Sequence, residues 1–377
     1  MSEFTSIDQQ MMSRAIQLAK RGIYTTAPNP NVGCVITKHG QIIGEGFHFK
    51  AGEPHAEVHA LRMAGDDAQG ATAYVTLEPC SHYGRTPPCA EGLIKANVTK
   101  VICAMTDPNP QVSGRGIQML REAGIEVQVG LLESEAIALN PAFIKRMKTG
   151  MPFVQLKMAA SLDGQTALNN GQSKWITASA ARQDVQAFRA QAGAILSSSQ
   201  TVIEDNASLN VRASDFPDWL STQLEQDTYH NTSQALRQPV RIILDRQHKL
   251  SEGLALFNSE GEVLTVAESD ADLLVACSDE GQLDLSQLLS QLATEQNINH
   301  IWVEAGATLA SSLIKHNLVD ELIVYLAPKL MGSDGRGLIG ALGLTDMTQC
   351  IDLNITDIRL LGQDVRIRAV PATHSNF

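Results

Sequence analysis

Helical and strand patterns alternate along the first half of the chain. Apolar Met11, Met12 and Ile16 recur at helical spacing after a capping box at 6–9, and Gly22 ends the pattern. Strand patterns fall at 32–36, 41–44, 73–77, 100–105 and 125–129, and helical patterns fall at 55–63, 89–96 and 116–123. This alternation predicts an α/β layer sandwich whose later strands are joined by helical crossovers.

The pattern begins again after a polar and basic segment at 145–150, so we expect two domains, 1–146 and 147–377. The second domain ends in strand patterns at 355–360 and 365–370, which predict an antiparallel pair. Its other strand patterns lie at 153–159, 194–197, 240–244, 300–304 and 322–326, with helices around 182–188 and at 307–315. The polar, aperiodic stretch 213–238 predicts a surface insertion rather than part of the core.

Composition narrows the class of protein. The chain has 377 residues, of which 44% are hydrophobic and 19% charged, as in ordinary globular proteins. Its net charge of −12 argues against nucleic acid as a partner, since binding to the phosphate backbone needs basic surface. The charge is uneven, because residues 1–146 carry 13 basic and 14 acidic groups and the remainder carries 16 and 27.

The cysteine count and the absence of long apolar runs indicate the compartment. Six cysteines are too few for a disulfide framework, and no apolar run approaches the about 18 residues of a membrane span. The first ten residues are polar and mixed, unlike a signal peptide. We therefore expect a reduced, cytoplasmic protein without membrane association, in which paired cysteines bind metal. Cys34 and Cys103 lie inside strand patterns and are expected in the core.

The strongest chemical signal is His55-Ala56-Glu57 followed by Cys80 and Cys89. One imidazole and two thiolates provide three ligands for tetrahedral zinc and leave a fourth position open to water, which is the catalytic form of a zinc site. His55 and Cys89 both begin helical patterns after proline, and a helix N-terminus favours the thiolate that a metal requires. Glu57 is placed to carry a proton between water and substrate.

Two other histidines offer rival ligands, and one rival motif fails. His59 and His82 lie near the same segments. His55 and His59 have the spacing of the helical metalloprotease pair, but that motif requires glutamate directly after the first histidine, where this chain has Ala56. The zinc nucleobase deaminase signature matches in its H-x-E half, although eight residues rather than two separate the cysteines here.

The second half lacks the G-x-G-x-x-G of a Rossmann dinucleotide site. Instead, the strand pattern 300–304 leads through Ala305 and Gly306 into a helix, an arrangement that lets a phosphate approach the amides of the helix start. This signal is weak by itself, because many α/β loops contain glycine.

Taken together, the motifs resemble those of the bifunctional deaminase/reductases of riboflavin biosynthesis. The resemblance spans nearly the whole chain except 213–238, and it rests on HAE at 55–57, PCSHYGRTPPC at 79–89, ASLDG at 160–164, SKWIT at 173–177, DNASL at 205–209 and VEAG at 303–306. It implies a cytidine deaminase-like α/β/α sandwich followed by an α/β domain similar to dihydrofolate reductase. It departs at Ala305, where many relatives have glycine, and at Arg246, where a small polar residue is common.

The resemblance also implies the reactions. The first domain would use zinc to hydrolyse the amino group of 2,5-diamino-6-(5-phosphoribosylamino)pyrimidin-4(3H)-one. The second would use NADPH to reduce the ribosyl group of the product, which gives 5-amino-6-(5-phosphoribitylamino)uracil. The expected partners are these small phosphoribosyl pyrimidines and further copies of the chain in a homo-oligomer.

Functional residues follow from the resemblance residue by residue. In the deaminase, His55, Cys80 and Cys89 would hold zinc, Glu57 would be catalytic, and the substrate would contact Asn29, His48 and Arg85. In the reductase, the catalytic residues would be Lys157, Asp205 and Glu304. Substrate contacts would be Ser173, Arg189, Leu209, Arg212 and Glu304. Cofactor contacts would be Ala159, Trp175, Thr201, Asp205, Gly306, Ala307, Thr308, Leu309, Ala310, Ser311 and Ser312.

Two other functions remain open on the residues alone. A tRNA adenosine deaminase with an accessory domain would share the zinc residues, but such enzymes tend to be small and basic, with a shorter cysteine spacing. A non-catalytic, zinc-stabilised binding protein is the second alternative. The presence of Glu57, which need not touch zinc, argues against it.

Overall fold

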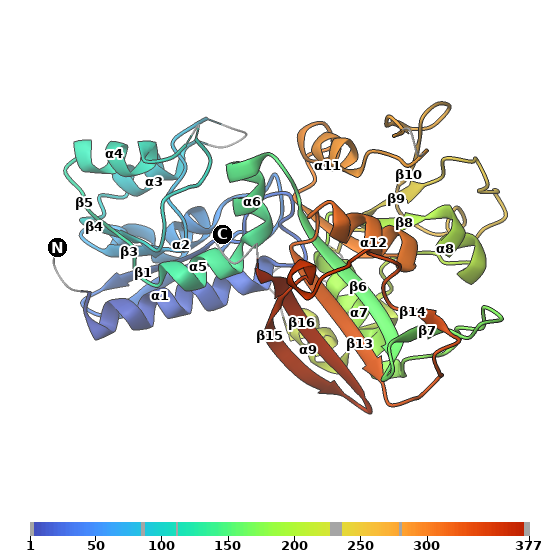
Figure 1. Cartoon of the computed structure of the whole chain (residues 1–377). Helices are drawn as coiled ribbons and strands as arrows, with labels where there is room; N and C mark the ends of the chain where they lie inside the picture. The colour runs from blue at the N-terminus through green and yellow to red at the C-terminus, as the bar shows by residue number, and fades with distance from the viewer. Residues whose placement is uncertain (1–3, 84–86, 111, 227–235, 279–280, 373–377) are drawn as a thin grey trace. The chain divides into compact units, whose positions relative to one another are not determined.

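The computed structural model describes residues 4–83, 87–110, 112–226, 236–278 and 281–372. The chain forms two compact units, Met1–Gly150 and Met151–Phe377 (Figure 1). Among the described residues, no helix combines the length and the apolar character needed to cross a bilayer.

The first unit is built on a five-stranded sheet of order β2-β1-β3-β4-β5. Strand β1 pairs antiparallel with β2 and β3, whereas β3, β4 and β5 are parallel. The strands are β1 (Gly33–Lys38), β2 (Gln41–Phe47), β3 (Thr72–Val75), β4 (Lys100–Cys103) and β5 (Glu126–Val129). The helices are α1 (Ser6–Ala19), α2 (Ala56–Ala64), α3 (Cys89–Lys95), α4 (Arg115–Glu122), α5 (Glu133–Leu139) and α6 (Pro141–Thr149).

The core of this unit fixes where α2 lies. Helices α2, α3 and α4 share one apolar cluster with the sheet, and this cluster contains Cys34 and Cys103, as expected from the sequence. A Cβ on Gly46 of β2 would lie 2.3 Å from the carbonyl oxygen of Ala56, so only glycine lets the start of α2 approach the strand this closely. The residue before Ala56 is His55, so the close approach also positions that histidine.

The capping box of α1 lies one residue earlier than the sequence pattern predicts. Thr5, not Ser6, is the N-cap, and its hydroxyl accepts a hydrogen bond from the Asp8 amide at 3.1 Å. The Asp8 carboxylate accepts in return from the Thr5 amide at 2.8 Å. The aspartate therefore takes the place that glutamate or glutamine usually has in this motif.

The second unit is built on a nine-stranded sheet of order β11-β10-β9-β8-β12-β6-β13-β16-β15. The strands are parallel from β11 to β13, and β13, β16 and β15 pair antiparallel, which confirms the predicted antiparallel pair at the end. The strands are β6 (Phe153–Ser161), β8 (Ala194–Ser198), β9 (Val240–Leu244), β10 (Val263–Ala267), β11 (Leu273–Leu274), β12 (His300–Glu304), β13 (Glu321–Ala327), β15 (Leu353–Leu361) and β16 (Asp364–Pro371).

Helices cover both faces of this sheet. Leu288 of α11 (Leu285–Thr294) and Leu313 of α12 (Ala307–Lys315) belong to a cluster on one face, and Phe188 of α7 (Ser179–Gln191) belongs to a cluster on the other (Figure 1). Successive residues of β12 alternate between the clusters, because Ile301 points to the first and Trp302 to the second. The remaining elements are α8 (Ser199–Asp205), α9 (Asp218–Gln226) and a small sheet of β7 (Gln165–Ala167) and β14 (Arg336–Gly337).

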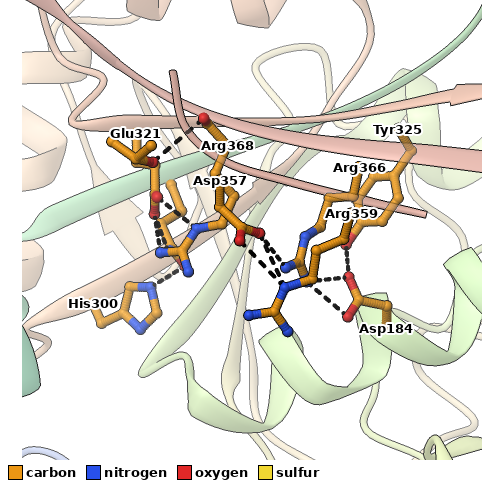
Figure 2. A network of polar contacts seen from close by, with 10 residues as sticks. Asp184, His300, Glu321, Tyr325, Asp357, Arg359, Arg366 and Arg368 are labelled. Carbon is orange, nitrogen blue, oxygen red and sulfur yellow. Dashed lines mark hydrogen bonds and ion pairs between the residues drawn. The ribbon is translucent and has the colours of Figure 1, made fainter. Parts of the chain in front are cut away.

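A polar network ties α7 to the antiparallel strands (Figure 2). Nη1 of Arg366 lies 2.9 Å from both carboxylate oxygens of Asp184, and Nη2 donates to Asp357 at 2.7 Å. The Tyr325 hydroxyl donates to Asp184 at 2.7 Å. Arg368 and Glu321 form a second pair across β16 and β13. These bonds fix α7, which carries Arg189, against the sheet.

The prediction that 213–238 is only a surface insertion is wrong for its first part. Residues 218–226 form α9, and the side chains of Phe216, Leu220 and Leu224 are buried. Leu220 and Leu224, four residues apart, lie on one face of this helix, and Phe216 is buried just before its start. Residues 227–235 lie outside the described residues. The basic segment near 145–150 is the end of α6, and the left-handed Gly150 closes the helix at the boundary of the unit.

Candidate functional site

Three ligand atoms converge in the first unit. His55 is the N-cap of α2, Cys80 follows β3, and Cys89 begins α3. Nδ1 of His55 lies 3.6 Å from the Cys80 sulfur and 3.3 Å from the Cys89 sulfur, and all three atoms lie within 4.8 Å of one another. Zinc bonds of about 2.0–2.1 Å to nitrogen and about 2.3 Å to sulfur, at tetrahedral angles, place such atoms about 3.6 Å apart. The three side chains therefore fit a tetrahedral zinc ion.

The two thiols are prepared for metal binding to different degrees. Hydrogen bonds with Cys89 and His55 lower the pKa of the Cys80 thiol to about 4. The Cys89 amide also donates to the Cys80 sulfur at 3.3 Å. The neighbouring Cys80 sulfur and burial raise the pKa of Cys89, so its proton is the one that metal binding must displace. We call His55, Cys80 and Cys89 the ligand group, and neither His59 nor His82 belongs to it.

Glu57 lies in the first turn of α2 with only 3% of its surface exposed. Burial raises the pKa of its carboxyl group, and the charge of His55 opposes that shift. Within the described residues, no lysine or arginine forms an ion pair with Glu57. The structure therefore places a buried carboxyl group beside the candidate ligand side chains, with the His55 imidazole as its charged neighbour and no lysine or arginine partner among the described residues.

Of the three predicted substrate contacts, His48 packs against the candidate ligand His55, and Asn29 is hydrogen-bonded to His48. The rings of His48 and His55 meet edge to face with centroids 5.1 Å apart. Nδ1 of His48 donates to the carbonyl of Pro54 at 3.2 Å, which leaves Nε2 to accept from the Asn29 amide at 3.1 Å. Burial and the charge of His55 lower the pKa of His48 to about 4, so its ring is neutral. Arg85 lies outside the described residues.

The structure adds two carboxylates that the sequence patterns did not single out. Glu78 is 3% exposed and accepts hydrogen bonds from backbone amides of 107–117. Asp107 is 9% exposed, and burial raises its pKa to about 6. Both follow the carboxyl end of a parallel strand, β3 or β4, and that position is the signal that could have found them.

A cavity of about 670 Å³ opens at the carboxyl ends of β6, β8 and β12 in the second unit. Most of the predicted reductase residues line it: Lys157, Ala159, Ser173, Trp175, Arg189, Thr201, Asp205, Leu209, Arg212, Glu304, Gly306, Ala307, Thr308 and Leu309. The three remaining residues do not line it. Ala310 is buried in the apolar core, and the Ser311 hydroxyl bonds to the Ala307 carbonyl and the Gly340 amide. Ser312 lies in the same helix, α12.

The charges at the centre of this cavity are paired. Nε and Nη2 of Arg189 donate to the two oxygens of Glu304 at 2.5 and 3.0 Å, and the Trp302 indole donates to the same carboxylate at 2.9 Å. Burial alone would raise the pKa of Glu304, but the charge and hydrogen bonds of Arg189, with Lys157 and Trp302, lower it to about 2. Glu304 is therefore an anion throughout the ordinary pH range.

The pKa values of the other two predicted catalytic residues, Lys157 and Asp205, are shifted in the direction that favours the neutral form, unlike that of Glu304. Burial lowers the pKa of the Lys157 ammonium, although the charge of Glu304 opposes the shift. Burial raises the pKa of Asp205, against the charge of Lys174. Both shifts favour the neutral forms, as groups that exchange protons require.

The remaining predicted contacts surround this centre. Trp175 is not a core residue, because 68% of its surface is exposed, and the Arg182 guanidinium lies over its ring at 4.7 Å. Gly306 is the N-cap of α12, and Thr201 lies in the first turn of α8. Arg212 forms an ion pair of 2.6 Å with Asp215 at the edge of the cavity.

Comparison with known proteins gives a consistent result. The family model "cytidine and deoxycytidylate deaminase zinc-binding region" matches residues 5–105, and "RibD C-terminal domain" matches residues 152–367. The riboflavin biosynthesis protein RibD of Haemophilus influenzae is 52% identical over 98% of this chain and 99% of its own length. The RibD of Escherichia coli is 51% identical over 97% and 100%.

Solved structures agree over the same length. Acinetobacter baumannii RibD (form 1) has a TM-score of 0.87 and 47% identity, covering 97% of this chain and 99% of that chain. A diaminohydroxyphosphoribosylaminopyrimidine deaminase/5-amino-6-(5-phosphoribosylamino)uracil reductase from Thermotoga maritima has a TM-score of 0.82 and 34% identity, with the same coverage.

A deaminase unit with a zinc site, joined to a reductase unit, defines a bifunctional deaminase/reductase. The chain belongs to the RibD family of riboflavin biosynthesis proteins. These findings confirm the family, the fold class, the two kinds of activity and the cofactors, zinc and NADPH, that the sequence predicts.

Proposed function

We propose that the chain deaminates 2,5-diamino-6-(5-phosphoribosylamino)pyrimidin-4(3H)-one and then reduces the product to 5-amino-6-(5-phosphoribitylamino)uracil. The supporting observation is that each unit has its own site. The first unit holds the ligand group and buried Glu57, and the second holds the cavity lined by Lys157, Asp205 and Glu304. The relative from Thermotoga maritima carries both activities in its name. We assign the deaminase to residues 1–146 and the reductase to 147–377.

In the deaminase, zinc supplies a Lewis acid that lowers the pKa of water. His55, Cys80 and Cys89 hold the ion. Glu57 takes the proton that water loses as the water oxygen bonds to the ring carbon, and it returns that proton to the amino group, so that the C–N bond breaks and ammonia leaves. Neutral His48, held by Pro54 and Asn29, presents a fixed edge to the pyrimidine ring. Arg85 would complete the substrate contacts.

In the reductase, NADPH supplies a hydride for C1′ of the ribosyl group. Lys157 and Asp205 move the proton to the ring oxygen as the sugar opens, because burial shifts both toward neutrality. Glu304 remains charged and stabilises positive charge at C1′, while Arg189 holds its carboxylate in place. Ser173, Leu209 and Arg212 bind the phosphoribosyl end.

The cofactor contacts lie at the start of two helices. Gly306 leaves the first amides of α12 accessible beside the cavity, and Thr201 lies at the start of α8. Ala159 and exposed Trp175 line the same cavity. We assign the helix contact to 306–309 rather than to the whole of 306–312, because 310–312 do not line the cavity.

We also propose a homo-oligomer in the cytoplasm. Strand β15 is an edge strand of the nine-stranded sheet, with apolar side chains exposed by 44 to 76%: Leu353, Ile355, Ile358 and Leu360. Edge strands with such surface favour pairing with another chain. Thiolate ligands and NADPH both suit a reducing compartment. If this face of β15 forms the interface between copies, the double variant Ile358→Lys/Leu360→Lys should be monomeric. Sedimentation measures its oligomeric state.

A paired assay tests the two reactions. The purified chain should release ammonia from the diaminopyrimidine and oxidise NADPH only after that release. Removal of zinc with a chelator should abolish ammonia release and leave reduction of the already deaminated substrate intact. Loss of both reactions on chelation, with the fold retained, would contradict the assignment of one reaction to each unit.

A further inference from the structure

Glu78 has an unusual set of partners that the proposed mechanism does not use. Its carboxylate is buried and accepts four backbone hydrogen bonds. Oε2 accepts from the amides of Asp107 at 3.1 Å and Gly114 at 2.9 Å, and Oε1 accepts from those of Gly116 at 2.8 Å and Ile117 at 3.2 Å. Two segments separated by about thirty residues of sequence are therefore joined through one side chain.

Part of this arrangement is a helix cap supplied from another segment. Gly114 is the N-cap of α4 and has no side chain to cap the helix. Gly116 and Ile117 are the second and third residues after it, whose amides an N-cap side chain normally satisfies. Glu78 takes that role from the end of β3, and its negative charge suits the positive end of the helix.

The start of α4 also packs closely against the segment that bears Cys80. A Cβ on Gly116 would lie 1.9 Å from the carbonyl oxygen of Pro79, so any side chain there would force the two segments apart. Pro79 is the residue between Glu78 and Cys80. Helix α4 also packs against α3, which begins at Cys89.

The two cysteines in turn depend on each other's position. The Cys89 amide donates to the Cys80 sulfur at 3.3 Å, and the Ala90 amide donates to the Cys80 carbonyl at 3.2 Å. A shift in either segment therefore changes the distance between the two sulfur atoms. Glu78 lies two residues before Cys80 in the same segment, and it is linked to the Cys89 helix through α4.

We propose that Glu78 is a positioning residue of the zinc site, which sets the separation of the two thiolate ligands through the start of α4. The proposal rests on the assignment of His55, Cys80 and Cys89 as ligands. Glu78 does not itself touch the ligand group.

The test is the variant Glu78→Gln, in the full chain. The amide keeps the shape of the side chain but turns one acceptor oxygen into a donor, which faces two amide donors. Zinc affinity, measured by competition with a chromophoric chelator, should fall about 10- to 100-fold, the usual effect of partners that orient ligands. The absorption bands of the Co²⁺-substituted protein should also shift, because they report the geometry of the sulfur ligands.

Asp8→Asn is the matched control. Asp8 is also a buried carboxylate that accepts backbone and side-chain hydrogen bonds at a helix start, but it belongs to the capping box of α1. Its loss should lower the melting temperature and leave zinc affinity and the Co²⁺ bands unchanged. If Glu78→Gln behaves in the same way, Glu78 only stabilises the fold and the proposal is wrong.

Two further variants separate the possible failures. Glu78→Asp keeps the charge but retracts it by one methylene group, and it serves if the glutamine variant does not fold. If neither variant folds, with or without zinc, Glu78 is a folding residue and the proposal is overturned. Cys89→Ser should lose zinc. If it keeps zinc, the ligand assignment fails, and with it the proposed deaminase site, whatever Glu78 does.

Discussion

Each unit buries a glutamate at the centre of its site, and the two glutamates have opposite partners. Glu57 lies beside the zinc ligands without an ion pair to lysine or arginine within the described residues, and burial raises its pKa. Glu304 receives two hydrogen bonds from Arg189 and one from Trp302, and its pKa is about 2. Both carboxyl groups are largely buried, with 3% of Glu57 and 12% of the Glu304 side chain exposed, so the partners make the difference.

The comparison shows how one residue type serves two reactions. A carboxyl group that binds a proton at moderate pH can carry that proton between water and a leaving group. A carboxylate paired with a guanidinium cannot carry a proton in this way, but it supplies a fixed negative charge that stabilises a cationic intermediate. We therefore propose that Lys157 and Asp205 transfer the proton in the reductase, because burial shifts the pKa of each in the direction that favours its neutral form.

The largest effect is expected from Glu57→Gln. The variant should bind zinc normally and lose about 100- to 10,000-fold in the rate of ammonia release, the usual contribution of a positioned acid–base group. Reduction of the deaminated substrate, in the other unit, should be unchanged. Metal analysis and the two separate assays measure these quantities. Ammonia release within a few-fold of normal would remove Glu57 from proton transfer.

A loss of stability is expected from Arg189→Met. The change leaves Glu304 buried without its cation, which costs about 3 kcal/mol of unfolding free energy when one partner of a buried pair is removed. All three tryptophans of the chain lie in the second unit, so their fluorescence follows its unfolding in urea. The double variant Arg189→Met/Glu304→Met is the control and should recover most of the loss. Equal losses in both variants would show that packing, rather than charge, is responsible.

The sequence predicts the first site much better than the second. The three proposed zinc ligands fall within 35 residues, and their identities and order are those that a zinc site requires, so the motif predicts them, although His59 and His82 are rival ligands on the sequence alone. The pairing of Arg189 with Glu304 joins α7 to β12 across 115 residues, and nothing in either segment indicates it. Only the resemblance to a known family pointed to both residues, and it could not give their contact.

In the fold, too, the sequence predicts features that depend on neighbouring residues better than features that depend on contacts between distant segments. Strands β9 and β12 and helix α12 have the predicted bounds, because each is a strongly periodic run between turns. Helix α9 was missed because its apolar positions, such as Leu220 and Leu224, are sparse in a polar segment. Glu78 was missed because its four partners are backbone amides, which no residue type indicates, and its place after a parallel strand is the one sequence signal that pointed to it.

Low pH should lower the unfolding free energy of the second unit, because Glu304 becomes protonated. Its pKa in the folded chain is lower than the ordinary value, so its contribution to stability is complete above about pH 4.5 and declines as the pH falls toward 2. Between pH 6 and pH 3 the stability of the natural chain should therefore fall by about 2 kcal/mol more than that of Glu304→Gln. Tryptophan fluorescence in urea at each pH measures the difference. Parallel curves for the two proteins would mean that Glu304 is not held as an anion.

The smallest effect tests whether Asp205 resembles Glu57 rather than Glu304. Burial raises its pKa, and it lines the cavity beside Lys157, so it should take part in moving the proton that accompanies ring opening. Asp205→Asn should lower kcat for reduction about tenfold and change the KM for substrate little, the pattern of an interaction made mainly in the transition state. Glu252→Gln, at an exposed position of the same unit that does not line the cavity, is the control and should have normal kinetics. If Asp205→Asn instead raises only the KM for NADPH, Asp205 is a cofactor contact, and the proton in the reductase moves through Lys157 alone.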